Sequence, residues 1–156
     1  IMAAKAYTFK RAGTEEFKNL MIQVVKNAQK LGEVLKEYGF RLVSEGTDSH
    51  LLLVDLRPKG ITGKALEEAL DYVGITVNKN MVPFDTEKPT VTSGIRIGTT
   101  AVTIRGAVEE DMEEIGDIIK EVSENIGNKG KLDSIRERVI NLSNRLPLYN
   151  GDYDIV

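Results

Sequence analysis

Residues Phe40–Leu70 read FRLVSEGTDSHLLLVDLRPKGITGKALEEAL, and their pattern indicates the fold class. Two short runs, Phe40–Ser44 and His50–Leu56, are rich in residues that favour strands, and the turn-forming residues Glu45–Asp48 separate them. Because so few residues connect the runs, they are predicted to form an antiparallel hairpin. Arg57-Pro58-Lys59-Gly60 ends the second strand, and a short helix is expected to follow.

Amphipathic helices are expected on both sides of this hairpin. Apolar residues recur there at three- and four-residue spacing, and Thr14 and Thr62 are suited to be N-caps. Gly13 is expected to end the first helix, in a left-handed cap conformation that glycine tolerates. The expected helices are Ile1–Ala12, Thr14 to about Gly39, Gly63–Tyr72, Glu109–Ile126 and Lys131–Arg145.

Two further strands, Ile75–Asn78 and Ser93–Gly98, flank a loop at Met81–Thr92, and the tail Leu148–Val156 is expected to be extended or frayed. The order of elements predicts an α+β fold, in which helices cover one face of a small, mostly antiparallel sheet. A length of 156 residues allows a single domain, 1–156.

The composition excludes several classes of function. The net charge of −3 gives no basic surface for nucleic acid, and no apolar run approaches the ~20 residues that span a membrane. The chain has no cysteine and a single histidine, His50, so we expect no metal site and no disulfide. No signal-peptide core is present near the N-terminus, which predicts a cytoplasmic location.

The first residues enter a helical pattern at once, without a preceding turn or cap, as expected for a piece of a longer protein. Apolar side chains along Ile1–Phe17 are therefore expected to be exposed, where another domain would pack.

Arg96 is the strongest candidate for ligand binding. Side chains alternate along a strand, so Ile95 and Ile97 should face one side, and Arg96 the other with Gly94 and Gly98. The two glycines would clear space around a guanidinium whose fork suits a carboxylate. A structural salt bridge is the alternative, and it is the more common outcome for such a pattern.

Other polar residues favour structural roles. Asn78 and Asn80 can satisfy local backbone groups or meet the edge of a heterocycle, and Lys79 should be solvated or ion-paired. Asp48 is interpreted as capping its turn rather than acting with His50 as an acid–base pair. Asp55 should bond the loop that follows its strand, and the acidic residues of 109–114 suit the start of a helix.

Three longer segments resemble the serine hydroxymethyltransferase (glycine hydroxymethyltransferase) family in order and spacing. They are GTDSHLLLVDLRPKGITGKALEEAL at Gly46–Leu70, GITVNKNMVPFD at Gly74–Asp85, and VTSGIRIGTTAVTIRG at Val91–Gly106. IMAAKAYTFKRA at the start and VVKNAQ at Val24–Gln29 resemble the preceding helices of that family. The resemblance covers the chain to about Leu148, and it implies the C-terminal small domain of a fold-type I pyridoxal-phosphate enzyme.

The resemblance also implies roles for individual residues. Arg96 matches the arginine that holds the substrate carboxylate, and Asn80 matches the asparagine that faces the folate pterin. Pro89 matches a loop that borders folate. Lys88 and Thr90 stand where the family commonly has serine and phenylalanine, so they are folate candidates through backbone groups only. The family also commonly has proline at the position of Thr100 and phenylalanine at that of Ala107.

Enzymes of this family use pyridoxal phosphate to move a one-carbon unit from serine to tetrahydrofolate, giving glycine and methylenetetrahydrofolate. The threonine-rich stretch before the cofactor lysine has no match here, so no catalytic or cofactor-binding residue is expected in this chain. The expected partners are an N-terminal large domain, a second copy in a homodimer, and the substrates serine and glycine. The helices of residues 1–38 are expected to pack on the large domain and to lead into the small domain. The alternatives are a stand-alone, non-catalytic module that binds a small ligand and a domain with a purely structural or interaction role.

Overall fold

The computed structural model describes residues 1–148. Two helices come first, followed by two strands, a third helix, two more strands and three helices. The elements are α1 (Met2–Ala12), α2 (Glu15–Glu37), β1 (Arg41–Leu42), the 3₁₀ turn η1 (Val43–Glu45), β2 (Leu51–Asp55), the 3₁₀ turn η2 (Arg57–Lys59), α3 (Gly63–Val73), β3 (Asn78–Asn80), β4 (Gly94–Gly98), α4 (Thr100–Ile104), α5 (Glu109–Glu124) and α6 (Lys129–Arg145).

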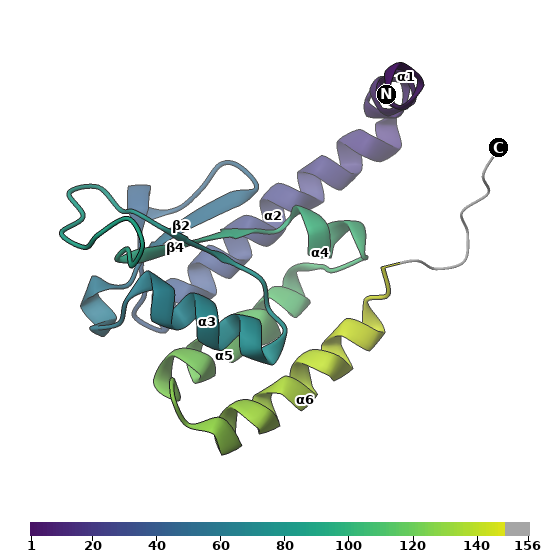
Figure 1. Cartoon of the computed structure of the whole chain (residues 1–156). Helices are drawn as coiled ribbons and strands as arrows, with labels where there is room; N and C mark the ends of the chain where they lie inside the picture. The colour runs from purple at the N-terminus through teal and green to yellow at the C-terminus, as the bar shows by residue number, and fades with distance from the viewer. Residues whose placement is uncertain (149–156) are drawn as a thin grey trace.

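The four strands form one antiparallel sheet in the order β1-β2-β4-β3 (Figure 1). The predicted hairpin is confirmed, since β1 pairs with β2 and Leu42 lies opposite Val54. In the centre, Arg96 lies opposite both Leu53 of β2 and Asn78 of β3. The predicted α+β fold with a small antiparallel sheet is therefore confirmed.

One face of the sheet is covered by helices. Leu52, Val54, Ile95 and Ile97 point to that side and are buried. α2 and α5 cross close together there, because Gly116 has no side chain where a Cβ would come within 2.4 Å of Val34. α3 and α6 pack beside them (Figure 1). The opposite face carries Arg96, which is exposed.

Some predicted boundaries were wrong. The first strand ends at Leu42 instead of Ser44, because Ser44 and Glu45 have positive φ angles that break the strand. The strand expected at 75–78 lies at Asn78–Asn80, because Ile75 still donates to the carbonyl of Leu70 at the end of α3. The helix expected to reach residue 126 ends at Glu124, and the last helix begins at Lys129.

Two helix caps are as predicted and one is not. The hydroxyls of Thr14 and Thr62 accept hydrogen bonds from the amides of Phe17 and Ala65. Gly13 has a φ of −83°, so it does not adopt the left-handed conformation expected of it. Its amide instead continues the helical turn toward the carbonyl of Lys10.

The sequence did not predict α4, which packs on α2 through a buried polar network. The side-chain amide of Asn27 donates to the hydroxyl of Thr103, at 2.9 Å, and to the carbonyl of Ala107, at 2.8 Å. The hydroxyl of Thr99 donates to the carbonyl of Val24. These contacts stabilise a short helix of β-branched residues that has little intrinsic preference for helix.

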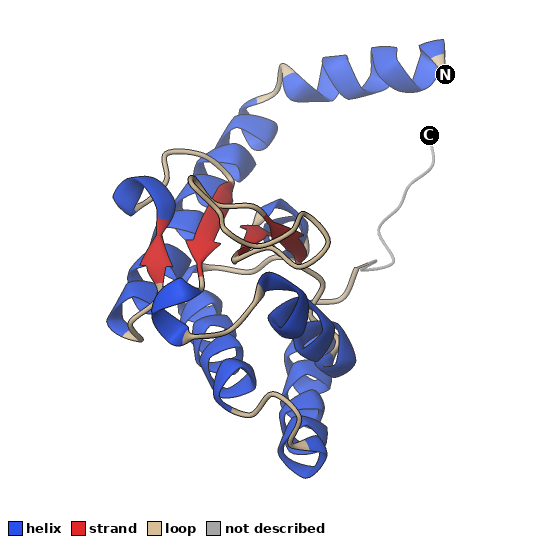
Figure 2. Cartoon of the chain, turned by 60° about the vertical axis from the view of Figure 1, so that its left-hand side comes forward, coloured by secondary structure: helices blue, strands red, loops and turns tan. Residues whose placement is uncertain are grey.

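α1 projects away from the rest of the molecule (Figure 2). None of its residues is buried. The predicted exposure of apolar side chains near the N-terminus is confirmed for Ile1, Met2, Tyr7 and Phe9. The tail that was expected to be extended or frayed lies outside the described residues beyond Leu148.

Candidate functional site

Arg96 and Asn80 line one shallow pocket of about 310 Å³ on the open face of the sheet. Arg96 lies in β4, and Asn80 ends the neighbouring strand β3, whose antiparallel pairing fixes the two residues relative to each other. The turn between β1 and β2 forms the opposite wall, which includes Ser44, Thr47 and Asp48. The pocket therefore combines a guanidinium, an amide, hydroxyl groups and one carboxylate.

The guanidinium of Arg96 is free to bind a ligand. Among residues 1–148, no carboxylate lies within ion-pair distance of it, and no hydrogen bond holds it. The structural salt bridge that the sequence left open is absent from this part of the chain. An unpaired arginine on an open face suits a planar anion such as a carboxylate.

The sequence suggested that Gly94 clears space around the guanidinium of Arg96, but the structure gives this glycine a different role. A Cβ at this position would lie 2.6 Å from the carbonyl oxygen of Val54 and 2.6 Å from Val82. Gly94 is thus required for close packing of backbone and loop, rather than to clear space for Arg96. At Gly98 a Cβ would lie 3.3 Å from the side chain of Leu51, which is a tight packing contact, and it would not meet Arg96.

Asn80 and Lys79 point to different sides of β3. The ammonium group of Lys79 lies 2.7 Å from Glu67 of α3, so the expected ion pair is confirmed. The side-chain nitrogen of Asn80 donates to the carbonyl of Met81, which is the local backbone role expected of such an asparagine. Asn80 lines the pocket with Arg96, where its amide oxygen can accept a hydrogen bond from a ligand.

Lys88, Pro89 and Thr90 do not line the pocket of Arg96. They are exposed at the far part of the 81–92 loop. The end of this loop instead lies over the start of α3, where the amides of Gly63 and Lys64 donate to the carbonyls of Thr92 and Val91. The structure therefore brings Arg96 and Asn80 together and leaves these three residues apart from them.

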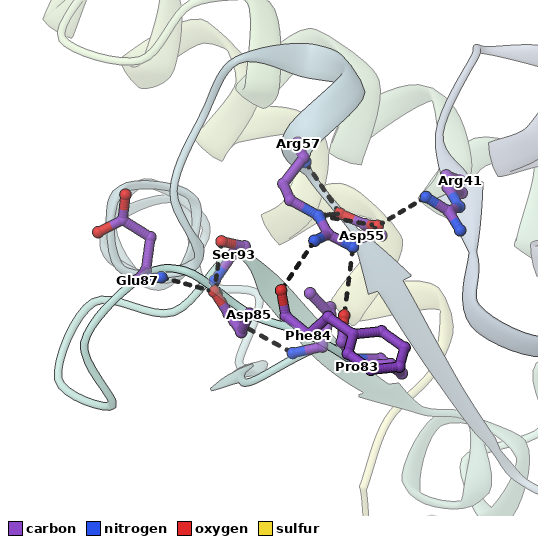
Figure 3. A network of polar contacts seen from close by, with 9 residues as sticks. Arg41, Asp55, Arg57, Pro83, Phe84, Asp85, Glu87 and Ser93 are labelled. Atoms are coloured by element: carbon purple, nitrogen blue, oxygen red, sulfur yellow. Dashed lines mark hydrogen bonds and ion pairs between the residues drawn. The ribbon is translucent and has the colours of Figure 1, made fainter.

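A second polar cluster lies beside the pocket (Figure 3). The carboxylate of Asp55 is buried and accepts hydrogen bonds from the guanidinium of Arg57, at 2.7 Å, and from the amide of Arg57, at 3.1 Å. The bond from Arg57 is the main reason that the pKa of Asp55 lies below its ordinary value, and Arg41 at 3.4 Å adds to the effect. The predicted role of Asp55, bonding the segment after its strand, is confirmed.

Asp85 organises the loop, and the sequence did not single it out. Burial by itself would raise the pKa of its carboxyl, but hydrogen bonds from Ser93, Glu87 and Val82 outweigh burial and lower the pKa well below its ordinary range. The signal in the sequence was weak, since an aspartate close to a proline, as in Pro83-Phe84-Asp85, is common in turns.

The remaining polar candidates have structural roles or none. Thr47, not Asp48, caps the turn before β2, because the hydroxyl of Thr47 accepts from the amide of Ser49. Asp48 and His50 share no hydrogen bond, so the structure shows no acid–base pair. At the start of α5, Asp111 accepts from the amide of Val108 as a cap.

Two further kinds of feature concern the described residues, a cluster of metal ligands and a membrane-spanning helix. Residues 1–148 contain no grouping of three histidine or acidic side chains that could hold a metal ion. None of their helices has the length and apolar character that crossing a bilayer requires.

The fold and the pocket define a small α+β domain that presents an unpaired arginine on the open face of its sheet. The family model of serine hydroxymethyltransferase matches residues 1–119 of the 156 residues, and the chain belongs to this family.

The family is one of pyridoxal-phosphate-dependent transferases, and that cofactor needs a lysine amine for attachment. The described lysines near the core do not fit. Lys79 is paired with Glu67, and Lys59 donates to the carbonyl of Tyr38. The pKa of Lys30 is raised by its hydrogen bond to Glu113, which favours the unreactive ammonium form. Each of these three lysines is therefore held in a contact that disfavours the free amine needed for such an attachment.

Proposed function

We propose that this chain forms the C-terminal part of a serine hydroxymethyltransferase and supplies the residue that holds the substrate carboxylate. The observation that carries the proposal is the unpaired guanidinium of Arg96 in the pocket with Asn80. Serine and glycine both have a carboxylate, which two parallel hydrogen bonds from a guanidinium would bind and orient.

In this proposal Asn80 faces the pterin of tetrahydrofolate. Its amide oxygen is available beside Arg96, and an amide group can match the donor and acceptor edge of a heterocycle. Folate is an extended molecule, so Pro89, with the backbones of Lys88 and Thr90, would contact a different part of it. The separation of these residues from the pocket is compatible with that arrangement.

The proposal assigns the cofactor chemistry to a large domain outside this chain. Pyridoxal phosphate supplies the electron sink for cleavage of serine, and this chain contributes carboxylate and folate contacts. The exposed apolar residues Tyr7 and Phe9 of α1 are the proposed surface for that domain. We also propose a homodimeric, cytoplasmic parent enzyme, as the family resemblance implies.

The test is a hybrid enzyme in which the 156-residue chain follows the cofactor-binding domain of an active serine hydroxymethyltransferase. We expect it to convert serine and tetrahydrofolate to glycine and methylenetetrahydrofolate. The isolated chain should neither catalyse this reaction nor form a borohydride-reducible adduct with pyridoxal phosphate at one specific lysine. An inactive but correctly folded hybrid, or a specific adduct on the isolated chain, would favour the alternative of a stand-alone module.

A further inference from the structure

We infer that Asp85 is a positioning residue, which holds the 81–92 loop in place so that Lys88, Pro89 and Thr90 can contact folate. The inference rests on the proposed function and deepens it. It also distinguishes the ligand contacts of the loop from those of Arg96 and Asn80, because the loop and the arginine pocket are held by different parts of the structure.

Asp85 binds both ends of the loop. One oxygen of its carboxylate accepts from the amide of Val82, at 3.1 Å, and from the amide of Ser93, at 2.9 Å. The other oxygen accepts from the hydroxyl of Ser93, at 2.7 Å, and from the amide of Glu87, at 2.9 Å. A single side chain thus joins the residues just after β3 to the residue just before β4 (Figure 3).

Arg57 provides a second anchor for the first part of the loop. Its guanidinium donates to the carbonyls of Phe84, at 3.3 Å, and Pro83, at 3.5 Å, while Asp55 holds it from the other side. Phe84 has a φ of +56°, which is unfavourable for a residue with a side chain, and its ring is 96% exposed. The ring contributes little burial, so the polar anchors maintain this conformation.

The positions of Asn80 and Arg96 do not depend on these anchors. Asn80 lies opposite Gly94 and Arg96 lies opposite Asn78 in the ladder between β3 and β4. Backbone pairing therefore fixes the pterin and carboxylate contacts. Residues 88–90, in contrast, lie between two sets of anchors outside the sheet ladder. The carboxylate of Asp85 binds the amides on both sides of them, at Glu87 and Ser93, and the amides of Gly63 and Lys64 in α3 bind the carbonyls of Thr92 and Val91. Asp85 provides the first of these anchors.

The experiment compares Asp85→Asn with Glu87→Gln in the 156-residue chain. Both variants remove one negative charge from the same loop, but Glu87 uses only its backbone amide in the network. Asparagine keeps one acceptor oxygen and replaces the other oxygen with an NH₂ group. That group cannot accept from the two donors that the replaced oxygen bound. We expect amide exchange at Val82 and Ser93 to increase about tenfold or more in Asp85→Asn, and to remain unchanged in Glu87→Gln.

The binding probe is 5-formyltetrahydrofolate, which is titrated into the hybrid enzyme that carries the wild-type or variant chain, and amide chemical shifts are compared in the 156-residue chain. Asp85→Asn should weaken its binding about tenfold, while the amide signals of Lys79 and Arg96 in the sheet stay unchanged. A purely structural role would shift the sheet signals as well and lower the melting temperature in proportion. Unchanged loop exchange in Asp85→Asn would also overturn the inference.

The two proposals can fail separately. If the hybrid enzyme with the wild-type chain does not bind the probe although the loop is protected from exchange, the folate role fails, and with it the functional part of the Asp85 inference. If this hybrid binds the probe and the hybrid with Asp85→Asn binds it equally well, only the positioning role of Asp85 is wrong.

Discussion

The ammonium group of Lys79 lies 2.7 Å from the carboxylate of Glu67, and this ion pair fixes the orientation of β3 on α3. The amide of Lys79 donates to the same carboxylate, at 2.9 Å. Because side chains alternate along a strand, a lysine directed at the helix leaves Asn80 on the face of Arg96. The lysine of the VNKN segment is thus structural, and it helps to orient the asparagine that lines the pocket.

Glu67→Gln should lower the stability of the chain by about 0.5–1 kcal/mol at pH 7, because the partly exposed pair is screened by solvent. The hydrogen bonds from Lys79 lower the pKa of Glu67 below its ordinary value. The contribution is therefore complete above the ordinary glutamate pKa and is lost as the pH falls through the lowered value. Thermal melts of wild type and variant should differ at pH 7 and converge in acid.

The matched control is Glu68→Gln. Glu68 pairs with Lys64 at 3.7 Å, and both side chains are largely exposed. Its replacement should leave the melting temperature nearly unchanged at both pH values. An equal effect of the two replacements on the melting temperature would mean that the ion pair between Lys79 and Glu67 stabilises the chain no more than an exposed pair does.

Gly63→Ala should destabilise the chain by about 1–3 kcal/mol, which is typical of overpacking. A Cβ at Gly63 would lie 2.1 Å from the hydroxyl of Thr92 and 2.3 Å from the carbonyl oxygen of Gly94. The backbone oxygen cannot move without displacing β4. Urea unfolding of the variant measures the loss.

Gly130→Ala is the control, since Gly130 also lies in the first turn of a helix but a Cβ there would meet only the side chain of Asn128, at 4.0 Å. Alanine should raise stability by about 0.5–1 kcal/mol at such a position. If both glycine variants gained stability, the close approach of α3 to β4 would be wrong.

Asn27→Ala should cost about 1–3 kcal/mol, because it leaves the buried carbonyl of Ala107 without its donor. Asn19→Ala tests the same change on the exposed side of the same helix, and it should be neutral or slightly stabilising. Calorimetry of both variants separates the contribution of the buried network to stability from the contribution of helix propensity. Similar melting temperatures for the two would show that the Asn27 network adds no stability.

The sequence predicted the features that depend on alternation and periodicity. Ile95 and Ile97 are buried and Arg96 is exposed, as the strand pattern required. The same reasoning could not predict α4, because Thr103 in it and Thr99 just before it are fixed by α2, which lies far away in the sequence. Local propensity favours other conformations for such β-branched residues, so tertiary contacts determine that this segment is helical.

Within the site, the sequence predicted Arg96 and Asn80 but not Asp85 or the true role of Gly94. The first two occupy positions of recognisable motifs on paired strands. Asp85 gains its importance from four donors that only the folded loop brings together. The need for glycine at position 94 comes from Val82 and Val54, whose approach no local pattern indicates.

Arg96→Ala should weaken the binding of serine and glycine in the hybrid enzyme about 30- to 5,000-fold, since one partner of a hydrogen-bonded charge pair is lost. Folding should change little, because Arg96 is exposed and has no ion-pair partner among residues 1–148. Arg96→Lys should recover little of the loss, because an ammonium group cannot reproduce the planar fork.

The measurement for Arg96 is substrate affinity from steady-state kinetics or titration, paired with a thermal melt. Arg136→Ala serves as the control: it removes another exposed arginine, which lies 6.0 Å from the ring of Tyr72 on the helical side of the domain. This control should leave substrate affinity unchanged. Near-normal serine affinity in Arg96→Ala, together with a large fall in melting temperature, would make Arg96 a structural residue. The pocket would then not be the carboxylate site, and the proposed function would lose the observation that carries it.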